Sequence, residues 1–366
     1  MVTSHSFDVP AHQNIYNHSL GRKLKITFSL DENNMNDETG LLLLVPGFGA
    51  SINSNVYKKM RDSFADEYNL VVIQCDYFGS EFMQDADKIT INQDVILRSL
   101  TDTQKNEVLR GESSLESFIQ YYKGTVPGVA VLNENIDNFN DMGFLQAIDL
   151  ITAVESVKII LKDNNYLFNQ NRLIGYGHSH GAYLLHLSNM LMPNLFSYII
   201  DNSSWIKPQY VKHARYSMIQ RNNATFNLSF NYLLRNILID AEILDLRNIK
   251  YEHDTKIHTQ ILCFQGTNDN LVDFSEKEAF INCFINSEMI LITDENIDNI
   301  IVKSNTHGLN ADFFQMFKYA IKKEKELTIN SIFECEIKIK DLQIKSFNKG
   351  LPIFVFSHLE NYYHTK

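Results

Sequence analysis

Apolar runs of strand length recur along the chain and alternate with segments of helical periodicity. The runs are residues 41–45, 70–76, 196–202, 260–266 and 288–293. Continuous runs of this kind suit strands that are buried on both faces, as in a parallel sheet covered by helices. The helical patterns lie between them, at residues 57–68, 138–162, 275–286 and 313–321. This order predicts an α/β fold with a mostly parallel central sheet and helices on both faces.

Two long stretches interrupt that alternation. Residues 79–140 contain one or two polar helical patterns followed by an apparent loop, and residues 206–250 contain no obvious strand. Both are too long for simple connections, so we expect cap-like insertions near the carboxyl ends of the strands, where ligand crevices form. The second insertion is basic, which is typical either of a solvated face or of a lid that attracts an anionic substrate.

The last part of the chain changes to a strand pattern of period two. Residues 333–340 alternate apolar and charged side chains, and residues 353–356 form a second run after a turn at 348–350. We therefore divide the chain into an α/β domain at 1–325 and a β-hairpin extension at 326–366. The hairpin extends the sheet, covers an edge or forms an oligomer contact, and the pattern does not choose among these.

Composition narrows the class of protein. The chain of 366 residues is 44% hydrophobic and 21% charged, as in an ordinary globular protein with a substantial core. Its net charge of −11 argues against a nucleic-acid partner. No apolar stretch has the length of a membrane span, and no secretory signal pattern is visible at the start. The four widely spaced cysteines predict free thiols in a reducing compartment, so we expect a cytoplasmic protein.

The segment around Ser179 carries the clearest chemical motif. Gly177-His178-Ser179-His180-Gly181 follows a short apolar run and precedes a helical pattern. This is the context of a nucleophile elbow, in which glycines allow strand and helix to approach closely and a strained serine is exposed. The alternative is a glycine-rich turn whose serine only caps the helix. The strand before and the helix after favour the nucleophile.

An acid and a base follow in the order that one hydrolase class uses. Asp269 stands three residues after the strand-ending Gly266, and His307 precedes the apolar helix at 313–321. Asp273 is a rival for the acid, although it lies further into the loop. His178 and His180 flank the serine and point elsewhere, so neither is the better base. No acidic or histidine partner with ligand spacing accompanies them, so we expect no metal.

Other residues are expected near the same edge of the sheet. Phe48 and Gly49 lie in a glycine-flanked turn after the strand at 41–45, and their backbone N–H groups, with that of His180, are candidates for an oxyanion hole. The alternative is a plain strand-to-helix turn. Asn202 ends the strand at 196–202 and Trp205 follows it, and we expect them, with His178, to line a substrate pocket.

These motifs together resemble a known superfamily. VPGFG, GYGHSHG, QGTNDNLVD and THGL, in that order and spacing over residues 22–322, are similar to the α/β-hydrolase superfamily of esterases, lipases and peptidases. The resemblance implies an α/β-hydrolase fold and a Ser-His-Asp triad. The histidine-flanked elbow and the segment NDMGFLQAIDL also resemble a bacterial family of unknown function encoded near flagellin-glycosylation genes.

The predicted chemistry is acyl transfer through Ser179, with His307 as base and Asp269 as its orienting acid. A serine hydrolase would cleave an ester or amide of a small molecule or glycan, such as an O-acetyl group on a sugar, without a cofactor. An acyltransferase would use the same acyl-enzyme with a sugar hydroxyl in place of water. The third hypothesis is a binding scaffold of hydrolase fold, in which an intact triad is not needed.

Overall fold

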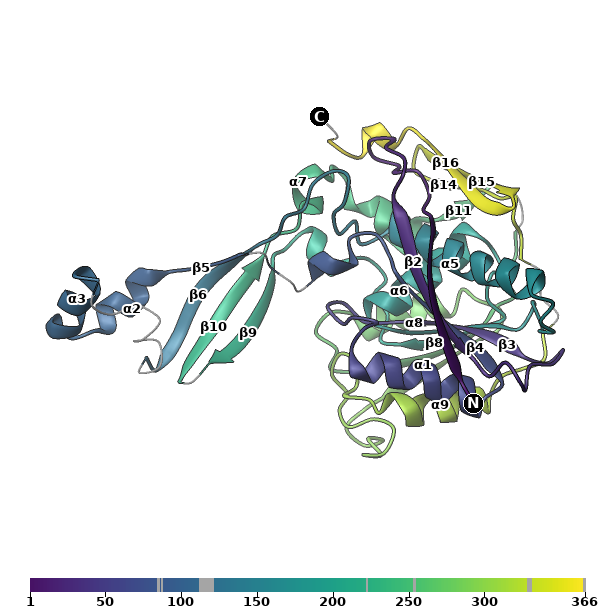
Figure 1. The fold of residues 1–366 in the computed structure, drawn as a ribbon, viewed down its shortest axis with the longest axis horizontal. Helices are drawn as coiled ribbons and strands as arrows, with labels where there is room; N and C mark the ends of the chain where they lie inside the picture. The colour runs from purple at the N-terminus through teal and green to yellow at the C-terminus, as the bar shows by residue number, and fades with distance from the viewer. Residues whose placement is uncertain are drawn as a thin grey trace.

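A computed structural model describes residues 1–83, 86, 88–111, 122–221, 223–252, 255–327 and 331–364. Its body is built on an eight-stranded sheet of order β1-β2-β4-β3-β7-β8-β12-β13 (Figure 1). The strands are β1 (Thr3–Pro10), β2 (Lys23–Leu30), β3 (Gly40–Val45), β4 (Leu70–Asp76), β7 (Leu173–His178), β8 (Tyr198–Asn202), β12 (Gln260–Gly266) and β13 (Ser287–Ile292). From β4 to β13 every neighbouring pair is parallel, and β2 runs antiparallel to both β1 and β4. The predicted α/β class is confirmed.

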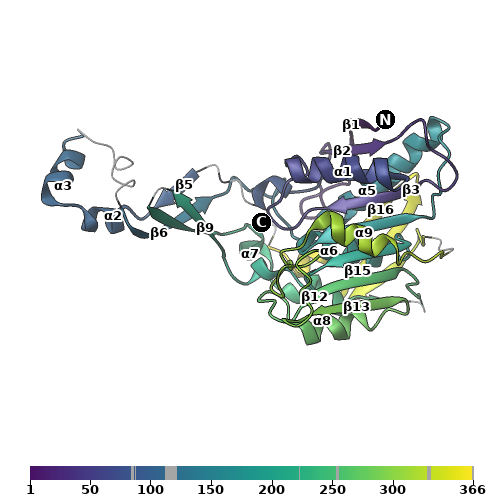
Figure 2. The same ribbon diagram turned by 90° about the horizontal axis from the view of Figure 1, so that it is seen from below.

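Helices cover both faces of this sheet (Figure 2). Along β3, Leu42 and Leu44 pack with helices α1 (Asn55–Glu67) and α9 (Phe313–Ile321). Leu41 and Leu43 point to the other face, which is covered by α5 (Phe144–Asp163), α6 (His180–Leu191) and α8 (Phe274–Ile281). Because successive strand side chains alternate between faces, a strand that is buried on both must be apolar throughout. This explains the continuous runs in the sequence.

Strand β1 was not predicted. It pairs with β2 over its whole length, from Thr3 opposite Leu30 to Pro10 opposite Lys23. It is an edge strand with mostly exposed side chains, so it carries no apolar pattern that could have revealed it.

The two insertions pair with each other to form an arm that projects from the body (Figures 1 and 2). Its sheet has the order β5-β6-β10-β9, with β5 (Lys88–Ile91), β6 (Gly124–Val131), β10 (Ala224–Phe230) and β9 (Arg215–Arg221). Strands β6 and β10, one from each insertion, run parallel. Two helices, α2 (Gln93–Ser99) and α3 (Asp102–Leu109), lie at the tip, and a short α7 (Leu234–Ile237) lies at the base.

The arm corrects two expectations. Residues 206–250 were expected to lack strands, yet β9 and β10 lie there and β11 begins at Lys250. In β10 every second side chain is buried, from Ala224 to Phe230, so the period-two signal was present and was missed. The loop expected after the polar helical patterns of the first insertion begins inside β6. Where one or two polar helices were expected, the structure has α2 and α3, and residues 112–121 of that prediction lie outside the described residues.

The C-terminal segment forms a third sheet. Its order is β11-β14-β15-β16, with β11 (Lys250–Tyr251), β14 (Glu336–Ile339), β15 (Leu342–Lys349) and β16 (Leu351–Ser357). The sequence pattern had revealed parts of β14 and β16 and had missed β15 between them. Phe356 of β16 packs edge-on against Phe144 of α5, with ring centroids 5.3 Å apart. The segment therefore covers a helix of the body, and an oligomer contact through it stays a prediction.

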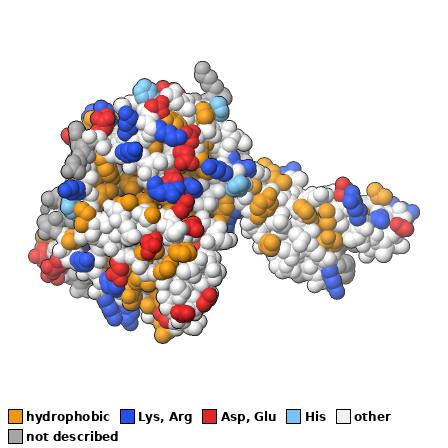
Figure 3. All heavy atoms as spheres, turned by 180° about the vertical axis from the view of Figure 1, so that it is seen from behind, with side chains coloured by type: hydrophobic (Ala, Val, Ile, Leu, Met, Phe, Trp, Pro, Cys, Tyr) orange, Lys and Arg blue, Asp and Glu red, His pale blue; other side chains and the backbone are white. Residues whose placement is uncertain are grey.

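The arm is distinct from the body in a space-filling view. From behind, the arm stands out as a protrusion with apolar side chains on its surface (Figure 3). Exposed apolar residues of the arm include Val129, Val131, Tyr216 and Met218. In the part of the chain that the structure describes, no helix combines the length and apolar character that crossing a membrane requires.

Candidate active site

Ser179 sits at a strained turn between β7 and α6. Its backbone angles are φ 52° and ψ −117°, a conformation that typically costs a non-glycine residue about 1–3 kcal/mol. The flanking glycines explain how the turn is possible. A Cβ atom on Gly177 would lie 2.6 Å from the backbone nitrogen of Ala182, and one on Gly181 would lie 2.3 Å from the carbonyl oxygen of Pro46. Only glycine fits at both positions.

The structure brings Ser179, His307 and Asp269 into one chain of hydrogen bonds. The Nε2 atom of His307 lies 2.7 Å from the Oγ of Ser179. Its Nδ1 atom lies 2.8 Å from Oδ2 of Asp269. The three residues stand on loops after β7, β12 and β13, at the carboxyl edge of parallel strands. That edge is where α/β proteins form their ligand crevices.

Asp269 is held as a hydrogen-bond acceptor. Burial alone would raise its pKa, but hydrogen bonds from His307 and from neighbouring groups outweigh burial and leave the pKa below its usual value. Its side chain is fully buried. Gln265 Nε2 donates to Oδ2 at 2.9 Å, and the amides of Leu271 and Val272 donate to Oδ1 at 2.8 and 3.0 Å. An ionised carboxylate only accepts, so Nδ1 of His307 carries the proton and Nε2 accepts from Ser179.

Asp273, the other candidate for the acid, has a structural role instead. Asp273 is the N-cap of α8, where its side chain accepts from the backbone nitrogens of Ser275 at 2.9 Å and Glu276 at 3.0 Å. It lies on the exposed side of the loop, and its contacts are with its own helix. Capping explains why an aspartate stands at this position.

The predicted oxyanion loop passes beside the nucleophile. A Cβ atom on Gly47 would lie 3.7 Å from the Cβ of Ser179. The amide of Gly49, which has φ +85°, donates to the sulfur of Met83 at 3.3 Å. Of the three predicted backbone donors, Gly49 therefore already has an acceptor within the protein. His180 follows Ser179 directly in the chain, and its ring centroid lies 5.3 Å from that of Phe48.

His178 lies in the packed interior rather than beside the triad. Tyr57 Oη is 3.0 Å from its Nδ1, and the ring of Phe313 stacks on it at 3.8 Å between centroids. Burial lowers the pKa of His178 to about 3, so the ring is neutral at physiological pH. Its ring contacts are with α1, β7 and α9, on the face of the sheet away from α6.

Asn202 connects the elbow to the loop of His307. Its carbonyl oxygen accepts from the backbone nitrogen of Ser179 at 2.8 Å, and its Nδ2 donates to the carbonyl oxygen of Gly308 at 3.4 Å. The next residue, Ser203, has φ 55° and accepts from the amide of Gly308 at 3.2 Å. The end of β8 and the residue after it therefore link the elbow of the nucleophile to the loop of the base.

Trp205 belongs to a cluster of rings around Phe48. The ring centroids of His180, Trp205, Tyr210 and Tyr232 lie 5.0–5.6 Å from that of Phe48. Both nitrogens of His180 and the Nε1 of Trp205 are buried without a hydrogen-bond partner among the described residues. Burial also lowers the pKa of His180 to about 3. A buried polar group without a partner typically costs about 1–3 kcal/mol of folding free energy. The unpartnered nitrogens of His180 and Trp205 therefore carry such a cost.

A buried charge cluster below the elbow was not predicted. Asp201 accepts from Lys277 Nζ at 2.7 Å and from Ser204 Oγ at 2.8 Å, and His186 Nε2 lies 2.8 Å away. Both charged side chains are fully buried. Burial would raise the pKa of Asp201, but Lys277 and His186 hold it well below its usual value. An aspartate inside the apolar run at 196–202 was the signal available in the sequence.

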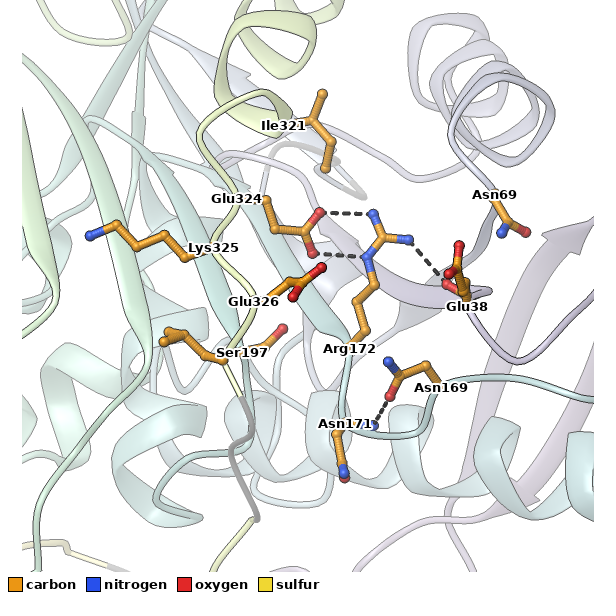
Figure 4. Close-up of a pocket in the computed structure, with 11 residues that line it drawn as sticks. Glu38, Asn69, Asn169, Asn171, Arg172, Ser197, Ile321, Glu324, Lys325 and Glu326 are labelled. Carbon is orange, nitrogen blue, oxygen red and sulfur yellow. Dashed lines mark hydrogen bonds and ion pairs between the residues drawn. The ribbon is translucent and has the colours of Figure 1, made fainter.

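A cavity of about 670 Å³ lies far from these residues. It is lined by Asn69, Arg172 and Ser197, which precede β4, β7 and β8, so it opens at the amino edge of the sheet (Figure 4). Arg172 is already neutralised there by a two-pronged bond to Glu324, at 2.9 and 2.8 Å. Among the described residues, no group of three or more histidine, cysteine or acidic side chains is placed to hold a metal ion.

Comparisons with known proteins give a family and a set of similar structures. The family described as Protein of unknown function (DUF2920) matches residues 5–215. No curated protein matches. Est1E from Butyrivibrio proteoclasticus is 12% identical, with a TM-score of 0.42 and coverage of 86% of this chain and 96% of that one. Thermogutta terrifontis esterase 2 is 11% identical, with a TM-score of 0.42 and coverage of 86% and 93%. Likenesses of this degree say nothing about substrate.

Proposed function

The chain belongs to the family described as Protein of unknown function (DUF2920), and we propose that it is a serine hydrolase that cleaves an ester through an acyl-enzyme. One observation carries this proposal. The hydroxyl of Ser179, the ring of His307 and the carboxylate of Asp269 form a continuous relay with links of 2.7 and 2.8 Å. A binding scaffold has no need of that relay, and a serine that only capped α6 would bond to the helix, whereas Ser179 makes no such bond.

The reaction follows from these roles. The Oγ of Ser179 attacks the ester carbonyl carbon while Nε2 of His307 takes its proton. Asp269 stabilises the imidazolium that forms. The backbone N–H groups of His180 and Phe48 stabilise the oxyanion, and each such donor is typically worth about 3 kcal/mol in the transition state. His307 then protonates the leaving alcohol, and a water molecule activated by the same ring releases the acid.

The test uses a fluorophosphonate probe, which reacts with activated serines. The intact chain should be labelled, and Ser179→Ala should abolish labelling while circular dichroism shows it folded. Ser51→Ala is the matched control, because Ser51 is an exposed serine of the oxyanion loop and plays no part in the relay. Labelling that persists in Ser179→Ala, or a folded wild type that never reacts, would refute the proposal.

Acetate release then separates hydrolysis from transfer. The substrates are O-acetylated sugars, with and without an unacetylated sugar as acceptor. We expect free acetate in both cases, because a hydrolase uses water. Acetate that appears only as a new sugar ester when the acceptor is present would instead identify an acyltransferase.

A further inference from the structure

Arg215 stands where the arm meets the oxyanion loop. It is the first residue of β9, and its guanidinium carbon lies 5.3 Å from the ring centroid of Phe48. The rings of Tyr210 and Phe230 lie at 5.9 and 5.7 Å. One guanidinium nitrogen, Nη1, donates to the carbonyl oxygen of Met83 at 2.8 Å. A cation is therefore held among rings, directly beside the loop that borders Ser179.

The charge of Arg215 has no acidic partner in the part of the chain that the structure describes. No Asp or Glu among the described residues forms an ion pair with it, in contrast to Arg247, which is paired with Asp245 at 2.7 Å. Glu134 is the acid that lies toward the nearby Tyr232. Both of its oxygens are committed to backbone amides, with Oε1 accepting from Asn140 at 2.9 Å and Oε2 from Leu233 at 2.6 Å. Arginine carries five N–H donors in a planar fork that matches a carboxylate. Because Met83 accepts from one of them, other donors of Arg215 remain to bind a carboxylate.

A second set of polar groups also lies beside Phe48. The ring centroids of Trp205 and His180 are 5.4 and 5.3 Å from that of Phe48, and their nitrogens have no partner among the described residues. An indole nitrogen only donates, and a neutral imidazole offers one donor and one acceptor. Together with Arg215 these groups present more donors than acceptors around one ring. Trp205 and His180 are fully buried, so the half-buried Arg215 is the member of this group that a ligand with acceptor oxygens can reach.

We propose that the ester substrate carries a carboxylate near its scissile bond, and that Arg215 binds this carboxylate above the oxyanion loop. The inference rests on the proposed function, because it names the substrate class of the same site. Aromatic walls exclude water and lower the local dielectric, so an ion pair here is stronger than one on the surface. If Arg215 served only to anchor the arm, the charge of the substrate would not matter.

The first test compares matched esters. Para-nitrophenyl hemisuccinate and para-nitrophenyl butyrate differ by a carboxylate on the acyl side, and meta-carboxyphenyl butyrate and phenyl butyrate differ by one on the alcohol side. Wild type should prefer the charged ester in at least one pair, measured as a ratio of kcat/KM. Arg215→Met keeps a long side chain without the charge and should lower that ratio by about tenfold or more. Arg221→Met is the control, because Arg221 is exposed at the far end of β9, and it should keep the wild-type ratio.

A ratio that is the same in Arg215→Met and wild type for both pairs overturns the inference, as does a wild type that prefers both neutral esters. Loss of the preference in Arg221→Met as well would show a general charge effect and would also overturn it. Esterase activity that survives in Ser179→Ala would refute the proposed function instead, so the two failures are distinguishable.

A binding measurement gives a readout that does not depend on turnover. Trp205 is the single tryptophan of the chain and touches Phe48, so its fluorescence reports on ligands at this place. In the Ser179→Ala background, monomethyl succinate should change the fluorescence saturably, and methyl butyrate should bind at least about tenfold more weakly. Adding Arg215→Met should remove that difference. Equal affinity for the two esters in the Ser179→Ala background would contradict the proposal.

Discussion

The Nε2 atom of His307 lies 2.7 Å from the Oγ of Ser179, although the two residues are 128 positions apart in the chain. Neither side chain alone sets that distance. Ser179 is raised by the strained elbow, and His307 is carried on the loop before α9. The end of β8 is bonded to both segments: the carbonyl oxygen of Asn202 accepts from the amide of Ser179, and the hydroxyl of the next residue, Ser203, accepts from the amide of Gly308. With the loop of Asp269, the relay therefore depends on four segments at one edge of the sheet.

Replacing the acid should leave a folded protein without turnover. In Asp269→Asn the side-chain amide can donate a proton toward Nδ1 of His307, which favours the tautomer whose Nε2 carries hydrogen and cannot accept from Ser179. We expect kcat to fall by about 10³-fold or more, as measured with para-nitrophenyl butyrate.

Asp273→Asn is the matched control for the acid, because Asp273 caps α8 without touching His307. Asparagine is also a good N-cap, so both stability and kcat should stay close to wild type. If Asp273→Asn abolished turnover and Asp269→Asn did not, the two roles would have to be exchanged.

The elbow should not tolerate a methyl group. In Gly181→Ala the new Cβ would lie 2.3 Å from the carbonyl oxygen of Pro46 and 2.5 Å from that of Val45. Because both contacts are with backbone, β3 and α6 must separate, and we expect a loss of at least about 2 kcal/mol in the free energy of unfolding by urea. Gly21→Ala, where no atom lies within 4 Å and only the positive φ is strained, should cost about 1 kcal/mol. Equal costs would contradict the close approach.

Removing Lys277 should show how much its buried ion pair with Asp201 contributes to the free energy of unfolding. Lys277→Met leaves Asp201 as an uncompensated carboxylate in the interior, which typically costs about 3–5 kcal/mol of unfolding free energy. Lys345→Met removes an exposed partner of Glu336 and should cost less than about 1 kcal/mol. Adding Asp201→Asn to Lys277→Met should recover part of the loss. A Lys277→Met protein as stable as Lys345→Met would rule out a buried ion pair.

Two buried histidines should make the fold sensitive to mild acid. The pKa values of His178 and His180 are lowered by burial from 6.5 to about 3, so each ring contributes stability above pH 6.5 that is lost as the pH falls toward 3. At pH 5 the loss is about 2 kcal/mol for each ring. His178→Gln should make the urea-unfolding free energy less dependent on pH between 7 and 5. His213→Gln, which alters an exposed side chain, should follow the wild-type curve. Coincident curves for His178→Gln and wild type would contradict this account.

The features predicted correctly are those that leave a local trace. A strand buried on both faces must be apolar at every position, and the five runs identified that way correspond to β3, β4, β8, β12 and β13. A tight turn from strand to helix needs glycines at set offsets, so the elbow could be located to the residue. Strand β1 left no such trace, because an exposed edge strand needs no apolar face.

The amino-acid sequence by itself determined the class of fold, the order of its buried strands and the loops on which Ser179, Asp269 and His307 stand, because each depends on neighbours in the chain. Only the tertiary structure decided that Asp269 rather than Asp273 contacts His307, that Lys277 pairs with Asp201, and that two distant insertions share one sheet. It also set Arg215 against Phe48. These are contacts between segments far apart in sequence, and their energies arise only when the folded chain removes both partners from water.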